Sequence, residues 1–261
     1  MTTRDTTPLA LVPAAGFARR LGAEIGTKAA IAIGSRWDHE GGHRIVEPLA
    51  GCLLDSLGRA GIAEGIVLRR AQGWDLAARL AAGTHRGLRL TYLVVPPTRG
   101  VPYTLARAAP LARGRVVALG FPDVLFEPRD AFARMLRRQA RSGAAVVLGL
   151  FPTATPWRTD MVVLDDDGRP LDLVLTPAET TLRFAWLLAV WTPEMTAFLE
   201  RWVESPAAAT IAAVREPRMG DVVRAALAAG MAIETEAFPE GSFFDVATPE
   251  DLAEARARFE G

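Results

Sequence analysis

Short apolar segments alternate with helical patterns over about the first 150 residues, and this alternation restricts the fold more than any other feature of the sequence. Such alternation with short connections is typical of βαβ units. It predicts a parallel sheet inside a three-layer αβα sandwich. The predicted strands are Leu9–Ala14, Ala29–Ile33, Gly65–Leu68, Leu90–Val95, Arg115–Leu119 and Ala144–Leu150, and the predicted helices are Val46–Ala60, Trp74–Leu80, Pro102–Leu111 and Pro128–Arg141.

The remainder of the chain has a different pattern. A hairpin is predicted where two apolar runs flank a turn at Asp167-Gly168, and the stretch Glu204–Pro217, with two prolines, is predicted as a loop. Thr248 is the expected N-cap of the last helix. We expect one domain with two halves, about residues 9–150 and 151–261. The other predicted strands are Met161–Leu164, Leu171–Leu175, Phe184–Trp191 and Met231–Ala237, and the other predicted helices are Pro193–Val203, Met219–Ala229 and Pro249–Phe259.

Composition excludes several classes of protein. Thirty basic residues balance thirty acidic ones, so no overall field favours nucleic acid or an anionic membrane as a partner. The single cysteine, Cys52, excludes a disulfide framework and any site with several cysteine ligands. The polar segment Met1–Pro8 does not resemble a signal peptide, and no run of about 18 apolar residues follows. We therefore expect a soluble, cytoplasmic protein.

A loop of small residues follows the first predicted strand. Ala14, Ala15 and Gly16 let the backbone approach a ligand closely, and free N–H groups in such loops hold phosphate oxygens. Arg20 and Lys28 place two cations beside this loop, which suits a polyphosphate. A tight turn that serves only strand packing is the alternative.

Lys28 is the only lysine of the chain, whereas twenty-nine residues are arginine. The two side chains differ where a compact point charge, rather than a wide planar fork, must fit. The retained lysine therefore indicates a site that needs a compact charge, and survival by drift is the alternative.

Two aspartates lie at predicted strand ends. Asp123 follows the strand Arg115–Leu119, and Asp245 lies between aromatic and aliphatic neighbours before the last helix. Ligands of open parallel sheets bind outside the carboxyl ends of the strands, and Mg²⁺ is commonly held by one or two carboxylates plus substrate phosphates. The pair predicts a magnesium site, and a capping role is the alternative for Asp123 alone.

In order along nearly the whole chain, these motifs resemble those of the sugar-1-phosphate nucleotidyltransferases, particularly the glucose-1-phosphate thymidylyltransferase-like group. That family has A-A-G-x-G-T-R-L followed by P-K, then G-D, then D-x-G-T-P-E-D-L. The matching segments here are Pro13-Ala14-Ala15-Gly16-x-Ala18-x-Arg20-Leu21 with Lys28, the strand ending near Asp123, and Asp245-Val246-Ala247-Thr248-Pro249-Glu250-Asp251-Leu252. The segment Gly100–Leu105 is similar to the family's G-x-x-x-x-L, which borders the nucleobase.

The resemblance implies a Rossmann-like, mostly parallel sheet of the GT-A-like nucleotidyltransferase type. It also implies transfer of a nucleotidyl group from a nucleoside triphosphate, with dTTP or UTP favoured, to a sugar 1-phosphate, with release of pyrophosphate. The first half would bind the nucleotide and the second half the acceptor, and whether the chain forms a homo-oligomer stays open. The implied roles are nucleotide binding by Ala14, Ala15, Gly16, Phe17 and Gly100, catalysis by Arg20, Lys28 and Asp123, and Mg²⁺ binding by Asp123 and Asp245.

The sequence departs from this family mainly in the acceptor half. The family's E-K-P segment stands here as Leu175-Thr176-Pro177, and its T-G segment as Leu187-Leu188. Ala18-Arg19 replaces Gly-Thr, and Thr27 replaces Pro. A nucleotide-binding protein of the same fold, with an altered acceptor or little transferase activity, is therefore the second hypothesis.

Two other functions fit the sequence less well. His39-Glu40-Gly41-Gly42-His43 matches the zinc-hydrolase pattern H-E-x-x-H, but two glycines cost a helix about 2 kcal/mol relative to alanine. We interpret it as a polar loop between a strand and a helix. A dinucleotide-binding Rossmann fold is disfavoured because Leu21 stands where a third small residue is needed.

Overall fold

A sheet of ten strands runs through the part of the chain that the computed structural model describes, namely residues 7–16, 27–38, 43–72, 74–80, 84–85 and 87–260. Strands β7, β1, β4 and β6 lie side by side and parallel, and β12 joins them to the second half by pairing antiparallel with β7 and β9. The strands are β1 (Leu9–Pro13), β4 (Glu64–Arg69), β5 (Thr84–His85), β6 (Leu88–Val94), β7 (Val117–Leu119), β9 (Val146–Pro152), β10 (Asp160–Leu164), β11 (Pro170–Leu175), β12 (Phe184–Trp191) and β13 (Ile233–Ala237).

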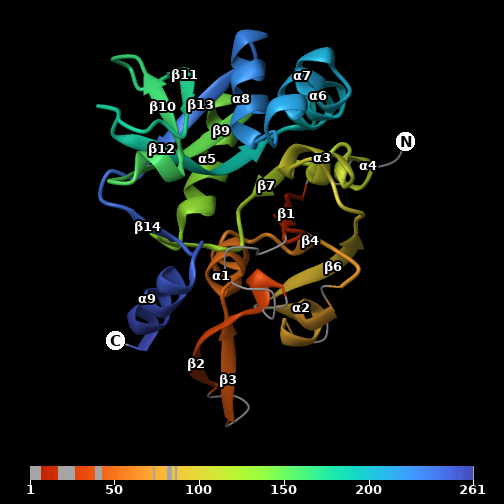
Figure 1. The fold of residues 1–261 in the computed structure, drawn as a ribbon, viewed down its shortest axis with the longest axis vertical. Coiled ribbons are helices and arrows are strands. Elements are labelled where there is room, and N and C mark those ends of the chain that lie inside the picture. Colours follow the sequence, from red (N-terminus) through yellow and green to blue (C-terminus); the bar gives the residue numbers. More distant parts are fainter. Residues whose placement is uncertain are drawn as a thin grey trace.

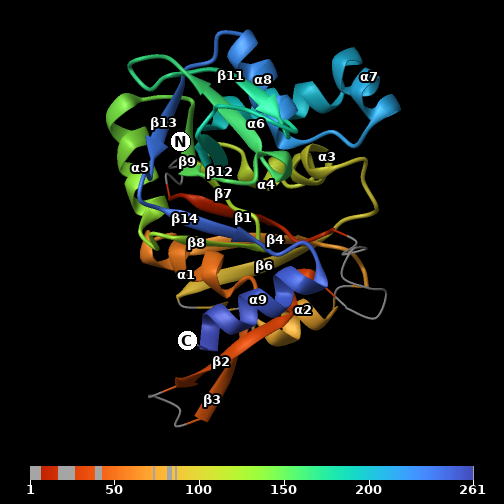
Figure 2. The ribbon, with the colours of Figure 1, turned by 60° about the vertical axis from the view of Figure 1, so that its left-hand side comes forward.

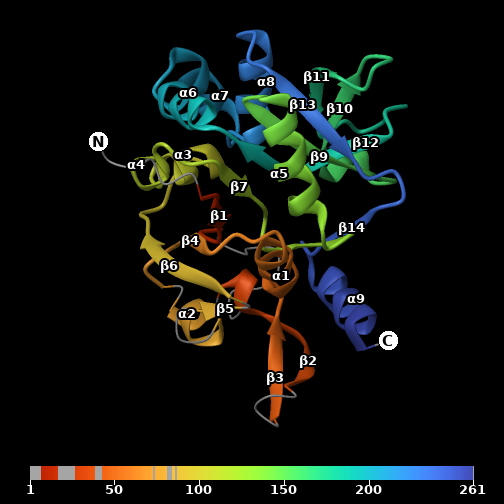
Figure 3. The same cartoon turned by 180° about the vertical axis from the view of Figure 1, so that it is seen from behind.

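Helices cover both faces of this sheet (Figures 1 and 3). Because side chains alternate along a strand, Ala10 and Val12 of β1 join one buried cluster and Leu9 and Leu11 join the other. The αβα sandwich with a mostly parallel sheet is thereby confirmed. Helices α1 (Gly51–Arg59), α2 (Trp74–Arg79) and α5 (Ala131–Ser142) pack on the first cluster, and α3 (Val101–Ala106), α4 (Ala109–Ala112), α6 (Pro193–Val203) and α8 (Met219–Ala228) pack on the second.

Two short antiparallel sheets flank the large one. Strands β8 (Val124–Glu127) and β14 (Ser242–Asp245) form the first, and β2 (Ala32–Asp38) and β3 (His43–Pro48) form the second. Helix α9 (Pro249–Glu260) lies along β2 (Figure 2). The predicted N-cap is confirmed, because Thr248 Oγ1 accepts a hydrogen bond from the Asp251 N–H at 3.2 Å.

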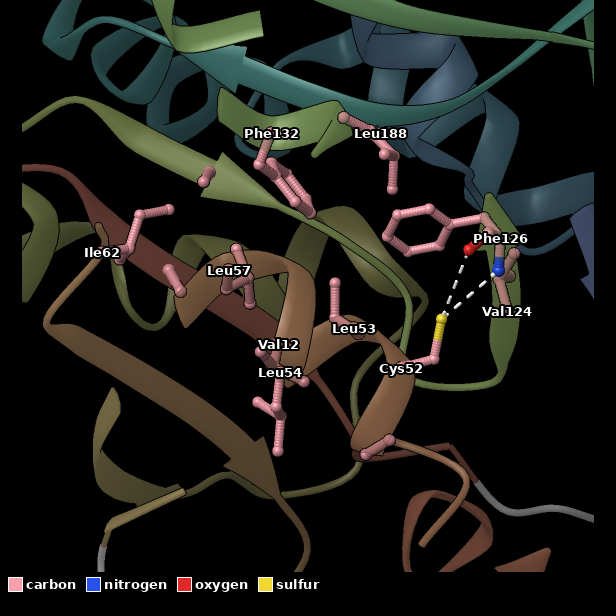
Figure 4. Packing of buried hydrophobic residues seen from close by; sticks show 14 of the residues in the cluster. Val12, Cys52, Leu53, Leu54, Leu57, Ile62, Val124, Phe126, Phe132 and Leu188 are labelled. Carbon is pink, nitrogen blue, oxygen red and sulfur yellow. Dashed lines mark hydrogen bonds between the residues drawn. The ribbon is translucent and has the colours of Figure 1, made fainter. Parts of the chain in front are cut away.

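Cys52 is buried where α1 meets β8 (Figure 4). Its Sγ donates to the Phe126 carbonyl at 3.6 Å and accepts from the Phe126 N–H at 3.4 Å. Burial raises the pKa of the Cys52 thiol to about 11. The side chain therefore acts as a small, protonated core residue.

Three predicted elements of the first half are wrong in extent. The helix expected from Val46 begins only at Gly51, because β3 extends to Pro48 and pairs with β2. The strand expected over Ala29–Ile33 is largely a 3₁₀ turn, η2 (Lys28–Ala30), and β2 starts after it. The helix expected over Pro102–Leu111 is divided into α3 and α4, since Pro110 has no N–H to continue the helical hydrogen bonds.

The loop expected over Glu204–Pro217 is also wrong, because it contains helix α7 (Pro206–Val214). Ser205 Oγ accepts a hydrogen bond from the Ala208 N–H at 3.2 Å, and Pro206 stands in the first turn, where its missing N–H is not needed. The alanines between the prolines are good helix formers. Among the helices in the described ranges, none is long and apolar enough to span a bilayer.

Candidate active site

The carboxyl ends of β1, β6 and β7 meet at a cavity of about 480 Å³, here called the first cavity. This is the edge at which open parallel sheets bind ligands. Six residues singled out from the sequence line it: Ala14, Ala15, Gly16, Lys28, Gly100 and Asp123. Two others, Phe17 and Arg20, lie outside the described residues.

The small-residue loop after β1 is held at both ends of its described part. The Ala14 N–H donates to the Leu68 carbonyl of β4 at 2.8 Å, and Arg70 Nη2 donates to the Gly16 carbonyl at 3.1 Å. A Cβ placed on Gly16 would meet none of the described residues within 4 Å. The described residues thus leave room for a ligand beside the backbone of Gly16, which lines the cavity.

Lys28 and Asp123 face each other in the first cavity. Lys28 Nζ donates to Asp123 Oδ2 at 2.6 Å, and 17% of the lysine side chain and 31% of the aspartate side chain are exposed. The 3₁₀ turn that carries Lys28 is tied to the start of α1, because the Ala50 N–H donates to the Ala29 carbonyl at 3.0 Å. A strand-end carboxylate and the lone lysine therefore meet although 95 residues separate them.

Gly100 is the point at which the second half approaches the first cavity. Its φ is +144°, and a Cβ built there would lie 2.4 Å from the Pro217 carbonyl oxygen and 3.0 Å from Glu216 Cγ. Glu216 lines both the first cavity and a second one. The sequence predicted a role for Gly100 but not this contact, because nothing local indicates that residues 216 and 217 return to it.

Asp245 lies beside Asp123 across the β8–β14 pair. Asp245 is opposite Val124 in the register, and the Val246 N–H donates to the Asp123 carbonyl at 3.0 Å. Both aspartates line the second cavity, of about 670 Å³, which adjoins the first. The C-terminal segment therefore brings Asp245 beside Asp123 in the backbone, and both residues line the same cavity.

The chemistry of this carboxylate pair fits Mg²⁺ that is shared with a substrate. Mg²⁺ usually takes one or two protein carboxylates and completes its shell with water and phosphate oxygens. Within the described ranges no three His, Cys, Asp or Glu side chains form a metal-binding group. Asp123 and Asp245 alone would make a weak site, so such an ion would need substrate oxygens.

Three arginines that the sequence analysis did not single out line the second cavity. Arg158 pairs with Asp251, Arg215 pairs with Asp221 at 2.8 Å, and Arg218 lies 3.5 Å from Asp160. The sequence does not show that the three lie together, because the tertiary fold brings Arg158 to the other two. Only the closeness of Arg215 and Arg218 in the sequence, just before α8, could have drawn attention to them.

Asp160 is a largely buried carboxylate of the second cavity, with 11% of its side chain exposed. Burial raises its pKa above the ordinary range, although Arg218 opposes the shift. Its Oδ2 would be only 2.3 Å from a Cβ on Gly220, so the glycine at the start of α8 makes room for it.

The segments that depart from the family pattern also lie at the second cavity. Thr176, in place of the family's lysine, and Leu187 both line it, and Leu187 and Leu188 both belong to the first buried cluster. Thr176 has a φ of +40°, which is unusual for a residue other than glycine. The second cavity thus has a wall different from the one that the resemblance implies.

The structure tests the predicted surroundings of the H-E-x-x-H segment but not its own backbone. His39 to Gly42 lie outside the described residues, but their flanks are strands, and Asp38 is paired with His43 in the β2–β3 register. The polar loop expected here was placed between a strand and a helix. It instead joins two strands.

Comparisons with known proteins identify the fold. No family model and no curated protein sequence matches this chain. A protein described as a glucose-1-phosphate thymidylyltransferase, from Bacillus anthracis and in complex with a sucrose, matches with a TM-score of 0.80 at 15% identity, covering 97% of this chain and 95% of its own.

Two further solved structures agree with this result. A UDP-glucose pyrophosphorylase complexed with UDP-glucose has a TM-score of 0.79 at 14% identity, covering 98% of this chain and 99% of its own. A UTP-bound UGPase from Acinetobacter baumannii has a TM-score of 0.75 at 14% identity, covering 97% and 93%. The chain therefore has the fold of these proteins over nearly its whole length.

Proposed function

We propose that this chain is a sugar-1-phosphate nucleotidyltransferase, which joins a nucleoside triphosphate to a phosphorylated acceptor and releases pyrophosphate. The observation that carries the proposal is the meeting of Lys28, Asp123 and Asp245 where the two cavities adjoin. The structural neighbours, described as a thymidylyltransferase and as UDP-glucose pyrophosphorylases, support the same reaction.

The first cavity would bind the nucleoside triphosphate. Ala14, Ala15 and Gly16 present backbone to it, and Gly100 borders its far side, where the base and ribose would lie. We assign Phe17 and Arg20 to the same ligand on the resemblance alone. A triphosphate carries concentrated negative charge, so the compact Nζ of Lys28 would neutralise the phosphates. The base stays a prediction, with dTTP or UTP favoured.

The reaction is an in-line displacement at the α-phosphorus. An oxygen of the acceptor phosphate forms a bond to that phosphorus, and the bond to the β-phosphate oxygen breaks, so that pyrophosphate leaves with the electron pair. Such transfers depend on positioning and charge neutralisation more than on covalent help from the protein. The junction of the two cavities is where an acceptor phosphate and an α-phosphate could approach each other.

Asp123 and Asp245 would hold Mg²⁺. When bound, the ion would neutralise phosphate charge and stabilise the charge that develops in the transition state. The chain's own contribution is to bring Asp123 and Asp245 to neighbouring positions at the second cavity. In the free protein, Lys28 Nζ donates a hydrogen bond to Asp123 Oδ2.

A nucleotide-binding protein with little transferase activity is the second candidate. Two observations favour it: Thr176 replaces the lysine of the family at the second cavity, and each of the three arginines there already has a carboxylate partner. An altered acceptor would explain the same features. Self-association and a cytoplasmic location also stay predictions.

A screen for pyrophosphate release tests the proposal. Each nucleoside triphosphate is incubated with each of several sugar 1-phosphates and Mg²⁺, and nucleotide binding is measured in parallel. We expect pyrophosphate release with at least one pair. Nucleotide binding without release from any pair would favour the second candidate.

Carboxylate variants test the site within this assay. Asp123→Asn and Asp245→Asn keep the shape but remove a charge, and each should lower turnover at least about 10²-fold. Asp166→Asn, on the exposed turn between β10 and β11, is the matched control and should leave turnover unchanged. Near wild-type turnover in both site variants would refute the assignment of the metal site.

A further inference from the structure

Arg158 lines the second cavity and pairs with Asp251 of the C-terminal segment. It is the last residue of the 3₁₀ turn η3 (Pro156–Arg158), between β9 and β10. Its Nη1 and Nη2 each donate to a different oxygen of Asp251, both at 3.1 Å. This two-pronged geometry fixes the orientation of the Asp251 carboxylate as well as its distance from Arg158. A single hydrogen bond would not fix the orientation.

Asp251 in turn holds the backbone of the turn between β14 and α9. Its Oδ2 also accepts hydrogen bonds from the N–H groups of Ala247 and Thr248, both at 2.9 Å. At the other end of the turn, the Val246 N–H donates to the Asp123 carbonyl. The backbone that follows Asp245 is therefore held on one side by Asp123 and on the other by Asp251.

We propose that Arg158 is a positioning residue for Asp245: by holding Asp251 it fixes the turn 246–251 and so the direction in which Asp245 presents its carboxylate beside Asp123. The inference rests on the proposed function in so far as that carboxylate binds a metal ion. It adds a residue of the second cavity to the machinery, which none of the sequence motifs indicated.

An ordinary surface ion pair would not have this role. Exposed pairs contribute little because solvent screens them. This pair is also at the surface, with 12% of the Asp251 side chain and 32% of the Arg158 side chain exposed, but it is two-pronged and joins segments 93 residues apart, so that its effect is to fix a turn. Partners that orient metal-binding carboxylates typically change metal affinity 10- to 100-fold when they are removed. Because Arg158 acts through Asp251, we expect the lower end, about 10-fold.

Electrostatics alone predicts that removing Arg158 would raise the affinity for a metal ion, whereas the proposal predicts that it would lower it. The two explanations can therefore be told apart. Arg158 and Asp245 line the same cavity, so a guanidinium there repels a metal ion at Asp245. Removing that positive charge without disturbing the turn would strengthen metal binding. Loss of the anchorage would instead weaken it.

The experiment measures Mn²⁺ affinity, as a paramagnetic probe of the Mg²⁺ site, by electron paramagnetic resonance with a non-hydrolysable nucleoside triphosphate and no acceptor. Arg158→Ala removes the anchor, and Arg158→Lys keeps the charge but loses the fork. The matched control is Arg224→Ala, which removes a similar fork between α8 and Asp172 of β11, away from both cavities. A second readout is hydrogen–deuterium exchange of the peptide that contains residues 246–251.

We expect both Arg158 variants to bind Mn²⁺ about 10-fold more weakly, with faster exchange in residues 246–251, while Arg224→Ala matches the wild type. Unchanged or tighter Mn²⁺ binding in Arg158→Ala, full recovery by lysine, or unchanged exchange would each overturn the proposal while leaving the proposed function intact. A wild type that binds no Mn²⁺ with nucleotide would overturn the metal site of the proposed function and the role of Arg158 together. The acceptor is absent throughout, so a lack of pyrophosphate release does not affect the result.

Discussion

Gly100→Ala tests how closely the two halves meet at the first cavity. The new Cβ would lie 2.4 Å from the Pro217 carbonyl oxygen, so the segment before α8 that contains Pro217 must move away by about 1 Å to reach ordinary contact distance. This segment is held in place on both sides of Pro217, because the Arg215 side chain and the Arg218 N–H both donate hydrogen bonds to the Asp221 carboxylate.

The expected loss has two parts. A side chain at a φ of +144° costs about 1–3 kcal/mol in backbone strain, and overpacking costs typically about 1–3 kcal/mol. We therefore expect Gly100→Ala to lower the free energy of unfolding by about 2–6 kcal/mol. A shift of about 1 Å at the rim of both cavities should also lower turnover by about 10²-fold.

Gly114→Ala is the control for backbone strain. Gly114 has a φ of +78°, and a Cβ there would meet nothing within 4 Å. It should lose only about 1–2 kcal/mol and keep its turnover. Denaturant unfolding and initial rates of pyrophosphate release are measured for both variants. If Gly100→Ala behaves like Gly114→Ala in both assays, the argument from the Pro217 contact is wrong.

Three other predictions follow from single side chains. Lys28→Arg should lower turnover by about 10²-fold with little loss of stability, because a planar guanidinium beside Asp123 takes more room than the compact ammonium and should displace the phosphates from in-line geometry; unchanged kinetics would remove Lys28 from the site. Cys52 should react with a thiol reagent at pH 8 only after denaturation, since burial raises its pKa to about 11, and rapid labelling of the native protein would contradict its burial. Although burial opposes the shift, the hydrogen bonds from Arg158 and the turn hold the pKa of Asp251 below its usual range. Its stabilisation should therefore be complete above about pH 4 and be lost as pH falls through the lower folded pKa, so wild type and Asp251→Asn should converge in denaturant unfolding only in stronger acid.

Local patterns predicted most of the sheet and its layers. Strands β7 and β12, which lie within the predicted runs Arg115–Leu119 and Phe184–Trp191, are buried almost throughout, and runs of this kind are apolar enough to identify from sequence. The strand-end rule then predicted that Asp123 would border a cavity. The position of Asp245 was predicted as the end of a short strand, which β14 confirms.

Other features depend on contacts that no local pattern encodes. Strand β3 was missed because its apolar residues continue into α1, so one helical pattern appeared to begin at Val46. Helix α7 was missed because prolines flank it, although Pro206 suits a first turn. The Arg158–Asp251 pair and the approach of Pro217 to Gly100 join distant segments, and neither has a sequence signature.

The most direct test of the central claim follows the oxygen atoms of the acceptor by ³¹P NMR. A sugar 1-phosphate with ¹⁸O in its non-bridging phosphate positions is incubated with the preferred nucleoside triphosphate and Mg²⁺. If an acceptor oxygen attacks the α-phosphorus, the phosphorus derived from the nucleotide will carry one ¹⁸O in the product, and the released pyrophosphate will carry none. Pyrophosphate that appears at the same rate without acceptor, or a product whose nucleotide phosphorus lacks ¹⁸O, would contradict the account.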